Sequence, residues 1–375
     1  MVLKSKHHEP SSRSYKTDLL IVAYGLGCGG TEKVVAYLSD YFCQKGRSVT
    51  LVTIDHEDND FFNLNPRVVR ISLSVDSLTE KTTNHSFGSQ LYRLLKLRRI
   101  IRNYRPKTII SFNPSVNILM LVSSVGINTK RIICERNNPY LQRVSRKLQI
   151  TRKVIYKMAD LITVNSDAAL KYFSDLNFGH KTSFVSNPIM VTSATFHEQS
   201  RQKTILFVGR LTHQKGLDIL LTAFSLSDLK SKGWQLIVVG EGADKQHYQK
   251  LAEKLSIHAF VSWVGLVSDL RAWYTETGLY VLPSRYEGTP NSLYEALSYG
   301  APAICSESLV KVHPIIDIVK PWVTFENESV QDLCEKLRHL CLDEDFRRSL
   351  AMDGHRYVGA LGSISGESEW EELLN

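Results

Sequence analysis

Short apolar runs alternate with longer amphipathic segments along the whole chain. In the first half, apolar runs begin at residues 18 (DLLIVAY), 48 (SVTLVTI), 108 (TIISFNP), 131 (RIICE) and 161 (LITVNS). In the second half, they begin near residues 204, 234, 260, 279, 301 and 322. Such runs predict buried strands, and the segments between them predict helices. Strands that alternate with helices are typical of α/β proteins with parallel sheets.

The two similar halves predict two domains. The chain has 375 residues, which is about twice the length of a typical domain. The strand pattern breaks after the sequence SNP at residues 186–188, in a polar stretch that reaches residue 203. We therefore expect one domain over residues 1–190 and a second over residues 191–359, joined in this polar stretch.

Composition indicates a cytosolic protein. No run of about 18 apolar residues is present, and residues 1–18 are polar and lack the apolar segment of a signal peptide. The six cysteines form no CxxC pair and fall mostly in predicted strands and helices. We therefore expect reduced, buried thiols and a protein that stays in the cytoplasm.

The segment SRYEGTPNSLYEALSYG, near the end of the second half, carries two glutamates eight residues apart, Glu287 and Glu295. Thr289 is suited to cap a helix through its hydroxyl, and Pro290 is suited to the first helical position, where no N–H is needed. The pattern therefore predicts a helix that starts near Asn291. Glu287 then precedes the helix, and Glu295 lies one turn inside it.

This junction follows the predicted strand LYVLPS, so it lies at the carboxyl edge of a sheet, where open α/β folds bind ligands. Backbone N–H groups of Asn291, Ser292 and Leu293 would face an anion there. A diphosphate at the helix end, with Glu287 before it and Glu295 beyond it for sugar hydroxyls, describes a nucleotide-sugar site. The simpler alternative is one acid that caps the helix and another on its surface.

Two further strands end in candidate binding residues. The strand at 204–211 ends in Gly209-Arg210 and is followed by Lys215. Arg210 and Lys215 therefore lie past the carboxyl end of a strand, where both can neutralise phosphate. The next strand, WQLIVVGEG, ends in Gly240-Glu241-Gly242.

The order and spacing of these residues resemble glycosyltransferase family four, the retaining enzymes of GT-B fold. The shared pattern consists of an Arg and a Lys, a Glu, seven residues, a second Glu, and a Gly-x-Pro strand, here Gly300-Ala301-Pro302. The resemblance extends over about residues 204–306. It implies two Rossmann-like domains that face each other across a cleft. It also implies that the helix in residues 360–375 crosses back to the first domain, where Trp370 packs.

The resemblance implies a role for each matching residue. Arg210 and Lys215 would hold the donor diphosphate and stabilise the leaving nucleoside diphosphate. Glu287 would approach hydroxyls of the transferred sugar, and these three are the candidate catalytic residues. Glu295 would bind the ribose. Further donor-binding candidates are Gly29, Gly30, Gly240, Glu241, Val264, Gly288, Thr289, Pro290, Asn291, Ser292 and Leu293.

A glycine-rich loop in the first half allows two interpretations. The sequence GLGCGG at residues 25–30 follows a strand and satisfies G-x-G-x-x-G, and Asp55 ends the next strand, as in a dinucleotide site. An NAD-dependent dehydrogenase, however, leaves the four charged residues of the second half unexplained. In the resemblance, Gly29-Gly30-Thr31-Glu32 matches a loop whose backbone amides approach the donor phosphates, which requires residues without side chains.

Basic residues are concentrated in the first half. Residues 1–190 carry 28 Lys and Arg against 14 Asp and Glu, whereas residues 191–375 carry 18 against 24. Residues 91–107 (LYRLLKLRRIIRNYRPK) hold seven basic residues and no acid, and a second basic cluster lies within residues 143–157. These segments are either solvated helix faces or helices on anionic lipid, with leucines and isoleucines of residues 91–101 in the interface. No recognised nucleic-acid module accompanies the charge, which disfavours a nucleic-acid partner.

Two smaller motifs remain. Glu135, Arg136 and Asn137 follow a strand and resemble a subset of the family that builds bacterial surface polysaccharides, so they are acceptor-side candidates, and Glu135 and Arg136 are alternatively donor-sugar candidates. Asp58 and Asp60 form a D-x-D pattern in an acidic loop, where a solvated loop is favoured over a metal site. We expect no metal and no cofactor besides the nucleotide sugar.

The sequence therefore predicts a retaining glycosyltransferase that moves a hexose or N-acetylhexosamine from a nucleoside diphosphate sugar, preferably UDP-linked, to a growing lipid-linked glycan. The expected setting is bacterial surface polysaccharide synthesis at the inner face of the cytoplasmic membrane. The alternatives are a GDP-mannose-dependent mannosyltransferase, a non-catalytic nucleotide-sugar binding protein and an NAD-dependent dehydrogenase. The sequence departs from many relatives at Asn113-Pro114, where they have a histidine, and after Gly300-Ala301-Pro302.

Overall fold

The computed structural model describes residues 16–74, 87–137, 139–140, 145–188, 201–312, 323–362 and 366–375. Three features from the sequence lie outside these ranges: the polar start of the chain, most of the expected linker, and residues 313–322 before the last predicted strand. No helix within the described ranges is long and apolar enough to cross a membrane.

The chain divides into two compact units. The smaller unit comprises Met1–Gly27, Thr31–Glu135 and Val144–Ile162. The larger unit comprises Cys28–Gly30, Arg136–Arg143 and Thr163–Asn375. The domain boundaries at residues 190 and 359 stay a prediction.

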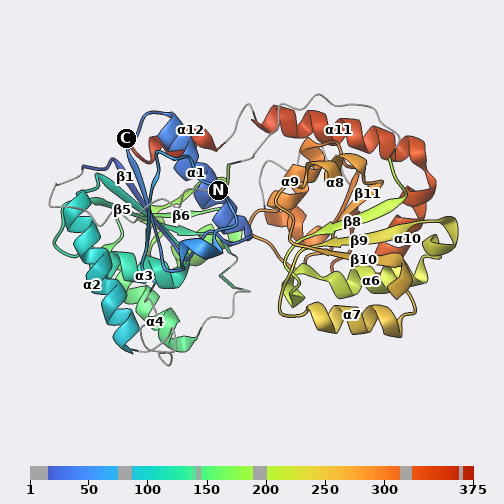
Figure 1. Ribbon diagram of the computed structural model, residues 1–375, viewed down its shortest axis with the longest axis horizontal. Coiled ribbons are helices and arrows are strands. Elements are labelled where there is room, and N and C mark those ends of the chain that lie inside the picture. The colour runs from blue at the N-terminus through green and yellow to red at the C-terminus, as the bar shows by residue number, and fades with distance from the viewer. Residues whose placement is uncertain are drawn as a thin grey trace, which may run out of the picture. The chain divides into compact units, whose positions relative to one another are not determined.

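The first sheet has seven strands in the order β3-β2-β1-β4-β5-β6-β7 (Figure 1), and β3, β2, β1, β4 and β5 pair in parallel. The strands are β1 (Leu19–Ala23), β2 (Val49–Thr53), β3 (Val69–Ser72), β4 (Thr108–Phe112), β5 (Lys130–Glu135), β6 (Leu161–Val164) and β7 (Thr182–Phe184). Strand β1 pairs in register with both neighbours, because Leu19 lies opposite Val49 on one side and Thr108 on the other. Every residue of β1, β2 and β4 is buried, as expected for central strands covered on both faces.

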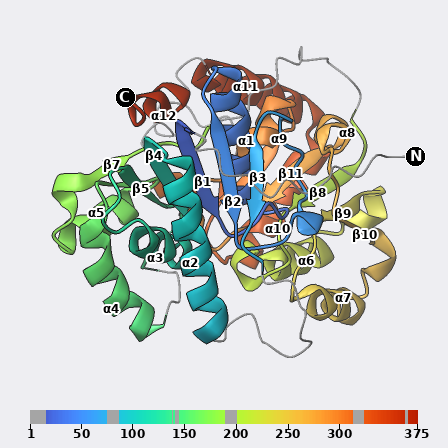
Figure 2. The same ribbon diagram turned by 60° about the vertical axis from the view of Figure 1, so that its left-hand side comes forward.

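In the described residues, five helices accompany the first sheet: α1 (Gly30–Gln44), α2 (Phe87–Tyr104), α3 (Pro114–Ser123), α4 (Arg146–Ile155) and α5 (Asp167–Asp175). Helix α3 contacts the sheet and lies between α2 and α4 (Figure 2). Serines fix two of the starts, since the Ser145 hydroxyl accepts from Leu148 N and that of Ser166 from Ala169 N.

The second sheet has six strands in the order β10-β9-β8-β11-β12-β13. They are β8 (Thr204–Val208), β9 (Gln235–Val239), β10 (Val261–Gly265), β11 (Leu279–Leu282), β12 (Ala303–Ser306) and β13 (Val323–Phe325). The remaining helices are α6 (Leu217–Leu226), α7 (Lys245–Lys254), α8 (Arg271–Glu276), α9 (Asn291–Ser298), α10 (Val330–Leu342), α11 (Glu344–Gly362) and α12 (Glu367–Glu372).

Side chains of β8 alternate between two apolar cores, one on each face of the second sheet. Ile205 and Phe207 belong to the core formed with α6, α7 and α10. Leu206 and Val208 belong to the core formed with α8, α9 and α11. Figure 1 shows these two groups of helices on opposite sides of the sheet. Successive side chains of a strand point to opposite faces, and both faces of β8 are covered by an apolar core. Residues 205–208 of the strand are therefore all apolar.

Both sheets have the strand order of the doubly wound Rossmann fold. Each sheet grows outward in both directions from its first strand, so the order reverses between β1 and β4 and again between β8 and β11. Ligands of such folds bind outside the carboxyl ends of the strands at this reversal. The α/β class with two Rossmann-like sheets is thereby confirmed.

Strands β3 and β7 were missed by the sequence analysis. Both lie at edges of the first sheet, and their side chains are half-buried or exposed. A short edge strand needs no apolar run, so its sequence carries little signal.

Helix α2 differs from the sequence hypothesis in its apolar residues. Leu97, Ile100 and Ile101, which were expected at a lipid interface, are buried in the core. Leu91 and Leu95 are exposed and remain available. The cysteines, all of which lie in described ranges, are free thiols; five are buried, whereas Cys28 is exposed.

Arg201 ties together the ends of two helices in the larger unit. Its Nη1 donates to the carbonyls of Thr275 (2.7 Å) and Thr277 (3.2 Å), and its Nη2 donates to that of Gly300 (2.6 Å). These carbonyls lie at the carboxyl ends of α8 and α9, where helices leave acceptors unpaired. Burial lowers the pKa of Arg201 to about 10.

We expect Arg201→Met to lower the free energy of unfolding by about 2 to 4 kcal/mol, because it leaves several half-buried carbonyls without a donor. Urea unfolding measures this change. The free energy of unfolding of Arg201→Lys should lie between those of the wild type and Arg201→Met. A loss below about 0.5 kcal/mol, the range of neutral surface substitutions, would show that the caps are dispensable.

Candidate functional site

The order reversal between β8 and β11 brings two predicted motifs to one edge of the second sheet. Strand β8 leads into Gly209-Arg210 and a 3-10 turn at His213–Lys215. Strand β11, its neighbour, leads into the loop that carries Glu287 and ends at α9. Parallel neighbours deliver both segments to the same carboxyl edge, as the sequence predicted.

Lys215 and Glu287 are in direct contact at this edge. Lys215 Nζ lies 2.5 Å from Oε1 of Glu287, and the hydroxyl of Ser284 donates to the same oxygen at 2.7 Å. Glu287 is 7% exposed. A carboxylate with two donors in a largely buried position is held in a defined orientation. Ser284 was not identified from the sequence, since a serine after a strand is too common to be a signal.

Backbone packing brings the two segments together. Gly216 follows Lys215 with a φ of +66° and starts α6, and a Cβ there would lie 2.1 Å from the carbonyl oxygen of Pro283. Only glycine fits both the left-handed conformation and this approach. The turn that carries Lys215 therefore rests on the backbone of the loop that carries Glu287.

The end of β9 approaches the end of β8 in the same way. Gly240 has a φ of +138°, and a Cβ there would lie 2.0 Å from the carbonyl oxygen of Gly209. Glu241 is half-buried and pairs with Lys245 one helical turn later at 2.5 Å. Val264 is half-buried against the core beside α9. Arg210, in contrast, is exposed and directed to solvent.

Helix α9 begins at Asn291, as predicted, but its cap differs from the prediction. Pro290, not Thr289, occupies the cap position, and its side chain makes no capping bond. The hydroxyl of Thr289 instead accepts from Nδ2 of Asn165 at 2.9 Å. Two of the three N–H groups expected to face an anion are occupied, because Asn291 N donates to the carbonyl of Thr289 and Leu293 N donates to that of Pro290, both at 2.9 Å.

Glu295 is half-buried on α9, beside a buried tyrosine. The pKa of Tyr274 is raised well above its usual value, first by burial and then by the negative charge of Glu295. Ser292, on the first turn of α9, accepts from the hydroxyl of Tyr280 at 2.9 Å. Glu295 and Ser292, both donor-binding candidates, therefore each interact with a buried tyrosine.

The loop before α9 also packs against residues that follow strands of the first sheet, all within the larger unit. A Cβ at Gly288 would lie 2.3 Å from the carbonyl oxygen of Arg136 and 3.0 Å from Asn165 Nδ2. Asn187 Nδ2 donates to Oδ1 of Asn291 at 3.3 Å. A Cβ at Gly30, next to Gly29 at the start of α1, would lie 3.4 Å from Asn291 Nδ2.

Asn165 and Asn187 were missed by the sequence analysis. Both are buried, and each has a side-chain oxygen without a hydrogen-bond partner among the described residues. The signal in the sequence is an asparagine shortly after the end of a strand. Such a residue lies at the carboxyl edge of a parallel sheet, where ligands bind.

Two of the three acceptor-side candidates, Glu135 and Arg136, are buried. Glu135 is 2% exposed and pairs with Arg152 at 3.3 Å, and it accepts hydrogen bonds from Tyr156 and Asn117. Burial, followed by the Glu135 charge, raises the pKa of Tyr156 well above its usual value.

Arg136 is also buried. It donates to the carbonyl of Val185 (2.6 Å) and to the hydroxyl of Thr163 (2.8 Å), and it stacks on Trp370, 4.8 Å from the ring centre. Asn137 is half-buried. A role for these residues in acceptor binding stays a prediction.

The D-x-D residues are placed differently from each other. Asp60 makes two hydrogen bonds with Arg70, at 2.9 and 3.0 Å, whereas Asp58 is exposed beside His56. Asp55, the acid of the dinucleotide interpretation, accepts from His56 N and from Asn59. Within the described part of the chain, no three His, Cys, Asp or Glu side chains are grouped in a way that could hold a metal ion.

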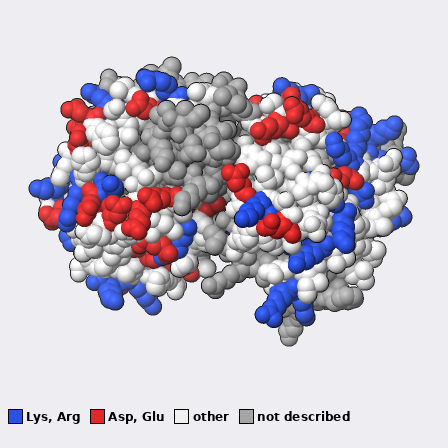
Figure 3. All heavy atoms as spheres, turned by 180° about the vertical axis from the view of Figure 1, so that it is seen from behind, with Lys and Arg blue, Asp and Glu red and all other residues white. Residues whose placement is uncertain are grey.

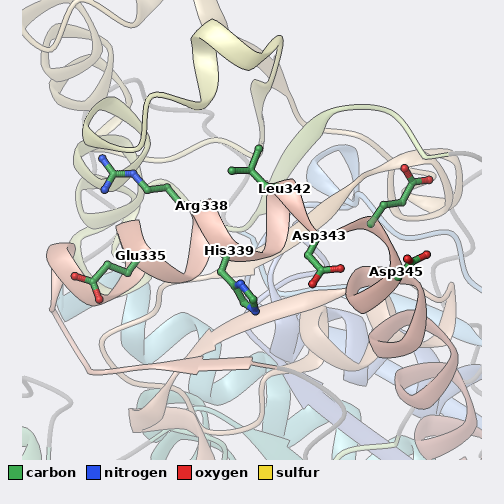
Figure 4. Close-up of a pocket in the computed structure, with 7 residues that line it drawn as sticks. Glu335, Arg338, His339, Leu342, Asp343 and Asp345 are labelled. Carbon is green, nitrogen blue, oxygen red and sulfur yellow. The ribbon is translucent and has the colours of Figure 1, made fainter.

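A shallow hollow lies on α10 and the start of α11 (Figure 4). It is lined by Glu335, Arg338, His339, Leu342, Asp343, Glu344 and Asp345. Arg338 crosses to the carboxyl end of α6, where it donates to the carbonyls of Leu226 (2.5 Å) and Ser227 (3.1 Å). The hollow contains none of the predicted site residues.

Comparisons with known proteins cover both halves of the chain. The family described as Glycosyltransferase Family 4 matches residues 28–192, and the family described as Glycosyl transferases group 1 matches residues 193–356. The two matches are contiguous, and the second contains the whole contact between Lys215 and Glu287.

Relatives of known name agree with this assignment. The chain is 25% identical over 93% of its length, and 96% of the other, to the GalNAc-alpha-(1->4)-GalNAc-alpha-(1->3)-diNAcBac-PP-undecaprenol alpha-1,4-N-acetyl-D-galactosaminyltransferase of Campylobacter jejuni. It is 24% identical over 95% of its length, and 99% of the other, to the amylovoran biosynthesis glycosyltransferase AmsD of Erwinia amylovora.

Among solved structures, a variant of S. aureus TarM in complex with UDP superimposes with a TM-score of 0.78 and 12% identity, over 96% of this chain and all of that one. This likeness shows a shared fold. The two contiguous family matches show that the chain belongs to glycosyltransferase family four, and the structural likeness shows that it has the GT-B fold.

Proposed function

We propose that the protein is a retaining glycosyltransferase that moves a hexose or N-acetylhexosamine from a UDP-sugar to a growing lipid-linked glycan. The observation that carries the proposal is the contact of Lys215 with Glu287 at the order reversal of the second sheet. A cation for phosphate and a carboxylate for sugar hydroxyls are thus held side by side, where a Rossmann-like sheet binds nucleotides.

The proposed reaction replaces one bond to the anomeric carbon with another. The acceptor oxygen forms a bond to this carbon, the bond to the diphosphate oxygen breaks, and the departing oxygen takes the acceptor proton. Lys215 and Arg210 stabilise the charge that develops on the diphosphate. When Lys215 turns toward phosphate, Glu287 keeps the hydrogen bond from Ser284 and is free to accept from a sugar hydroxyl.

UDP is the preferred nucleotide because the structurally similar TarM was determined with UDP. The name of the Campylobacter relative contains a diphospho-undecaprenol acceptor, which supports a lipid-linked acceptor. The name of the Erwinia relative supports polysaccharide biosynthesis. GDP-mannose stays the alternative donor. Release of UDP from a UDP-sugar in the presence of acceptor distinguishes transfer from simple binding and from dehydrogenase chemistry.

We also propose that the first-sheet helices dock on the inner face of the cytoplasmic membrane. Figure 3 shows Lys and Arg side chains along the outer edge of the half that carries the first sheet. Exposed apolar side chains accompany the charge, with Leu95 of α2 at 56% and Ile150 and Val154 of α4 at 65% and 59%. Basic residues beside exposed apolar ones suit an anionic lipid surface.

For the donor site, Arg210→Ala, Lys215→Ala and Glu287→Ala should each lower kcat/KM by about ten- to a hundredfold. Each removes a charge-assisted hydrogen bond worth roughly 1.5 to 3 kcal/mol in the transition state. Steady-state kinetics with UDP-sugar measures the loss. Lys250→Ala, on the exposed face of α7, is the control, and near-normal turnover in all three site variants contradicts the assignment.

For metal dependence, we expect turnover to survive EDTA, because cationic side chains rather than a metal ion neutralise the diphosphate. Asp58→Ala should be silent. Asp60→Ala should lower stability through the loss of Arg70 pairing while leaving kcat unchanged at a temperature where it is folded. Turnover that EDTA abolishes and manganese restores would establish a metal-dependent enzyme instead.

For the membrane surface, Arg99→Glu with Arg102→Glu should release the protein from anionic vesicles. Each basic residue contributes about 1 kcal/mol, so the loss of two weakens binding by at least roughly 25-fold. Arg98 is left intact because it donates to the carbonyls of Ser123 and Val125 at the end of α3.

Co-sedimentation at low and high salt measures this binding, since screening weakens the attraction. Lys250→Glu with Lys254→Glu, exposed on α7, is the control with the same change in charge. Equal binding to anionic and neutral vesicles, or binding to neither, would assign the basic residues to a solvated face.

A further inference from the structure

Arg285 lies two residues before Glu287, and its side chain contacts the segment that carries Lys215. Nη1 and Nη2 of Arg285 bind the two carboxylate oxygens of Asp218 at 3.0 and 2.7 Å, in a fork. Nη1 also donates to the carbonyl of His213 at 2.7 Å. Asp218 lies in the first turn of α6, directly after the Lys215 turn.

Main-chain bonds reinforce the same connection. Arg285 N donates to the carbonyl of Gln214 at 2.9 Å. The side-chain amide of Gln214 donates back to the carbonyl of Tyr286 at 3.0 Å. Residues on both sides of Lys215 are therefore bonded to residues directly before Glu287.

A third segment closes the arrangement. Nε of Arg285 donates to Oε1 of Glu328 at 2.6 Å, in the loop between β13 and α10. The guanidinium side chain is only 12% exposed, whereas the Glu328 side chain is 58% exposed. Asp218, whose side chain is 31% exposed, is thus the more enclosed partner, and Glu328 is an outer contact that adds little.

The pair of Arg285 and Asp218 is ionised. Hydrogen bonds to Asp218 raise the pKa of Arg285 above its usual value. Burial would raise the pKa of Asp218, but its hydrogen bonds and attraction to Arg285 outweigh burial and lower it. A bidentate pair of fixed charge constrains both distance and orientation, which a lysine cannot do.

We propose that Arg285 is a positioning residue that holds the Glu287 loop and the Lys215 turn at a fixed separation. The inference rests on the proposed function. The Arg285 side chain donates to His213, Asp218 and Glu328 rather than to Glu287, so it acts through Lys215 and Glu287. A transferred sugar on Glu287 and a diphosphate on Lys215 must be held together for reaction, whereas UDP alone needs no correct position of Glu287.

This geometry predicts a split between catalysis and nucleotide binding. Arg285→Ala should lower kcat on the order of 10- to 100-fold, as expected when a reacting group is misplaced by a fraction of an ångström to one ångström. The dissociation constant for UDP, measured by calorimetry, should change less than about threefold. A threefold change is smaller than the loss of one charge-assisted hydrogen bond would cause. Arg285→Lys should restore part of kcat.

Asp218 provides a second test. Asp218→Ala should lower kcat as Arg285→Ala does, and the double variant should lose no more than the worse single variant, because one contact is removed in all three. Losses that multiply instead would show that the two residues act separately.

Arg338→Ala is the matched control. Arg338 also anchors α6 through two backbone carbonyls, but at the carboxyl end of the helix and outside the site. Its removal should lower the melting temperature without lowering kcat at a temperature where all variants are folded.

The outcomes separate the two claims. The positioning role alone is overturned if the wild type transfers sugar and Arg285→Ala has the same kcat. It is also overturned if kcat falls as much in Arg338→Ala as in Arg285→Ala. A wild-type protein that neither binds UDP nor transfers sugar overturns the proposed function, and the positioning role with it.

Discussion

The ion pair between Lys215 and Glu287 is the contact on which the second half of the structure depends. The two residues are 72 positions apart, and they meet because β8 and β11 are neighbours at the point where the strand order reverses. The Lys215 side chain is 15% exposed and the Glu287 side chain 9%, so removing either partner would leave a mostly buried charge unpaired, which is costly. The surrounding loops supply what keeps the pair in place.

Close backbone contacts fix these loops more firmly than side chains do. Gly216, Gly240 and Gly288 lie where a Cβ would approach a carbonyl oxygen to 2.1, 2.0 and 2.3 Å. Each glycine lets the end of one strand rest on the segment after another, so the site is built from segments that cannot move apart without losing van der Waals contact. Arg285 then adds an ionic connection across the same segments.

The charged residues at the end of β5, in the first sheet, are buried among other side chains and backbone carbonyls. Glu135 and Arg136 end β5 where binding residues are expected, yet one is enclosed by Arg152 and Tyr156 and the other by backbone carbonyls and Trp370. These contacts hold the end of β5 in place, and a role of the two residues in acceptor binding stays a prediction. A charged residue at the carboxyl end of a strand is therefore not sufficient evidence for a binding site, because it can also make structural contacts.

The sequence by itself determined the α/β class, the two sheets, eleven of the strands in the described residues, and the start of α9 at Asn291, because buried strands and helix boundaries leave local signals. The sequence also predicted that Lys215 and Glu287 lie at the carboxyl edge of one sheet, because both follow strands and parallel strands end at the same edge. Only the tertiary structure decided which polar atoms meet there. Thr289 binds Asn165 rather than capping α9, and Arg285 reaches Asp218, because hydrogen-bond partners depend on distances between segments that no local pattern encodes.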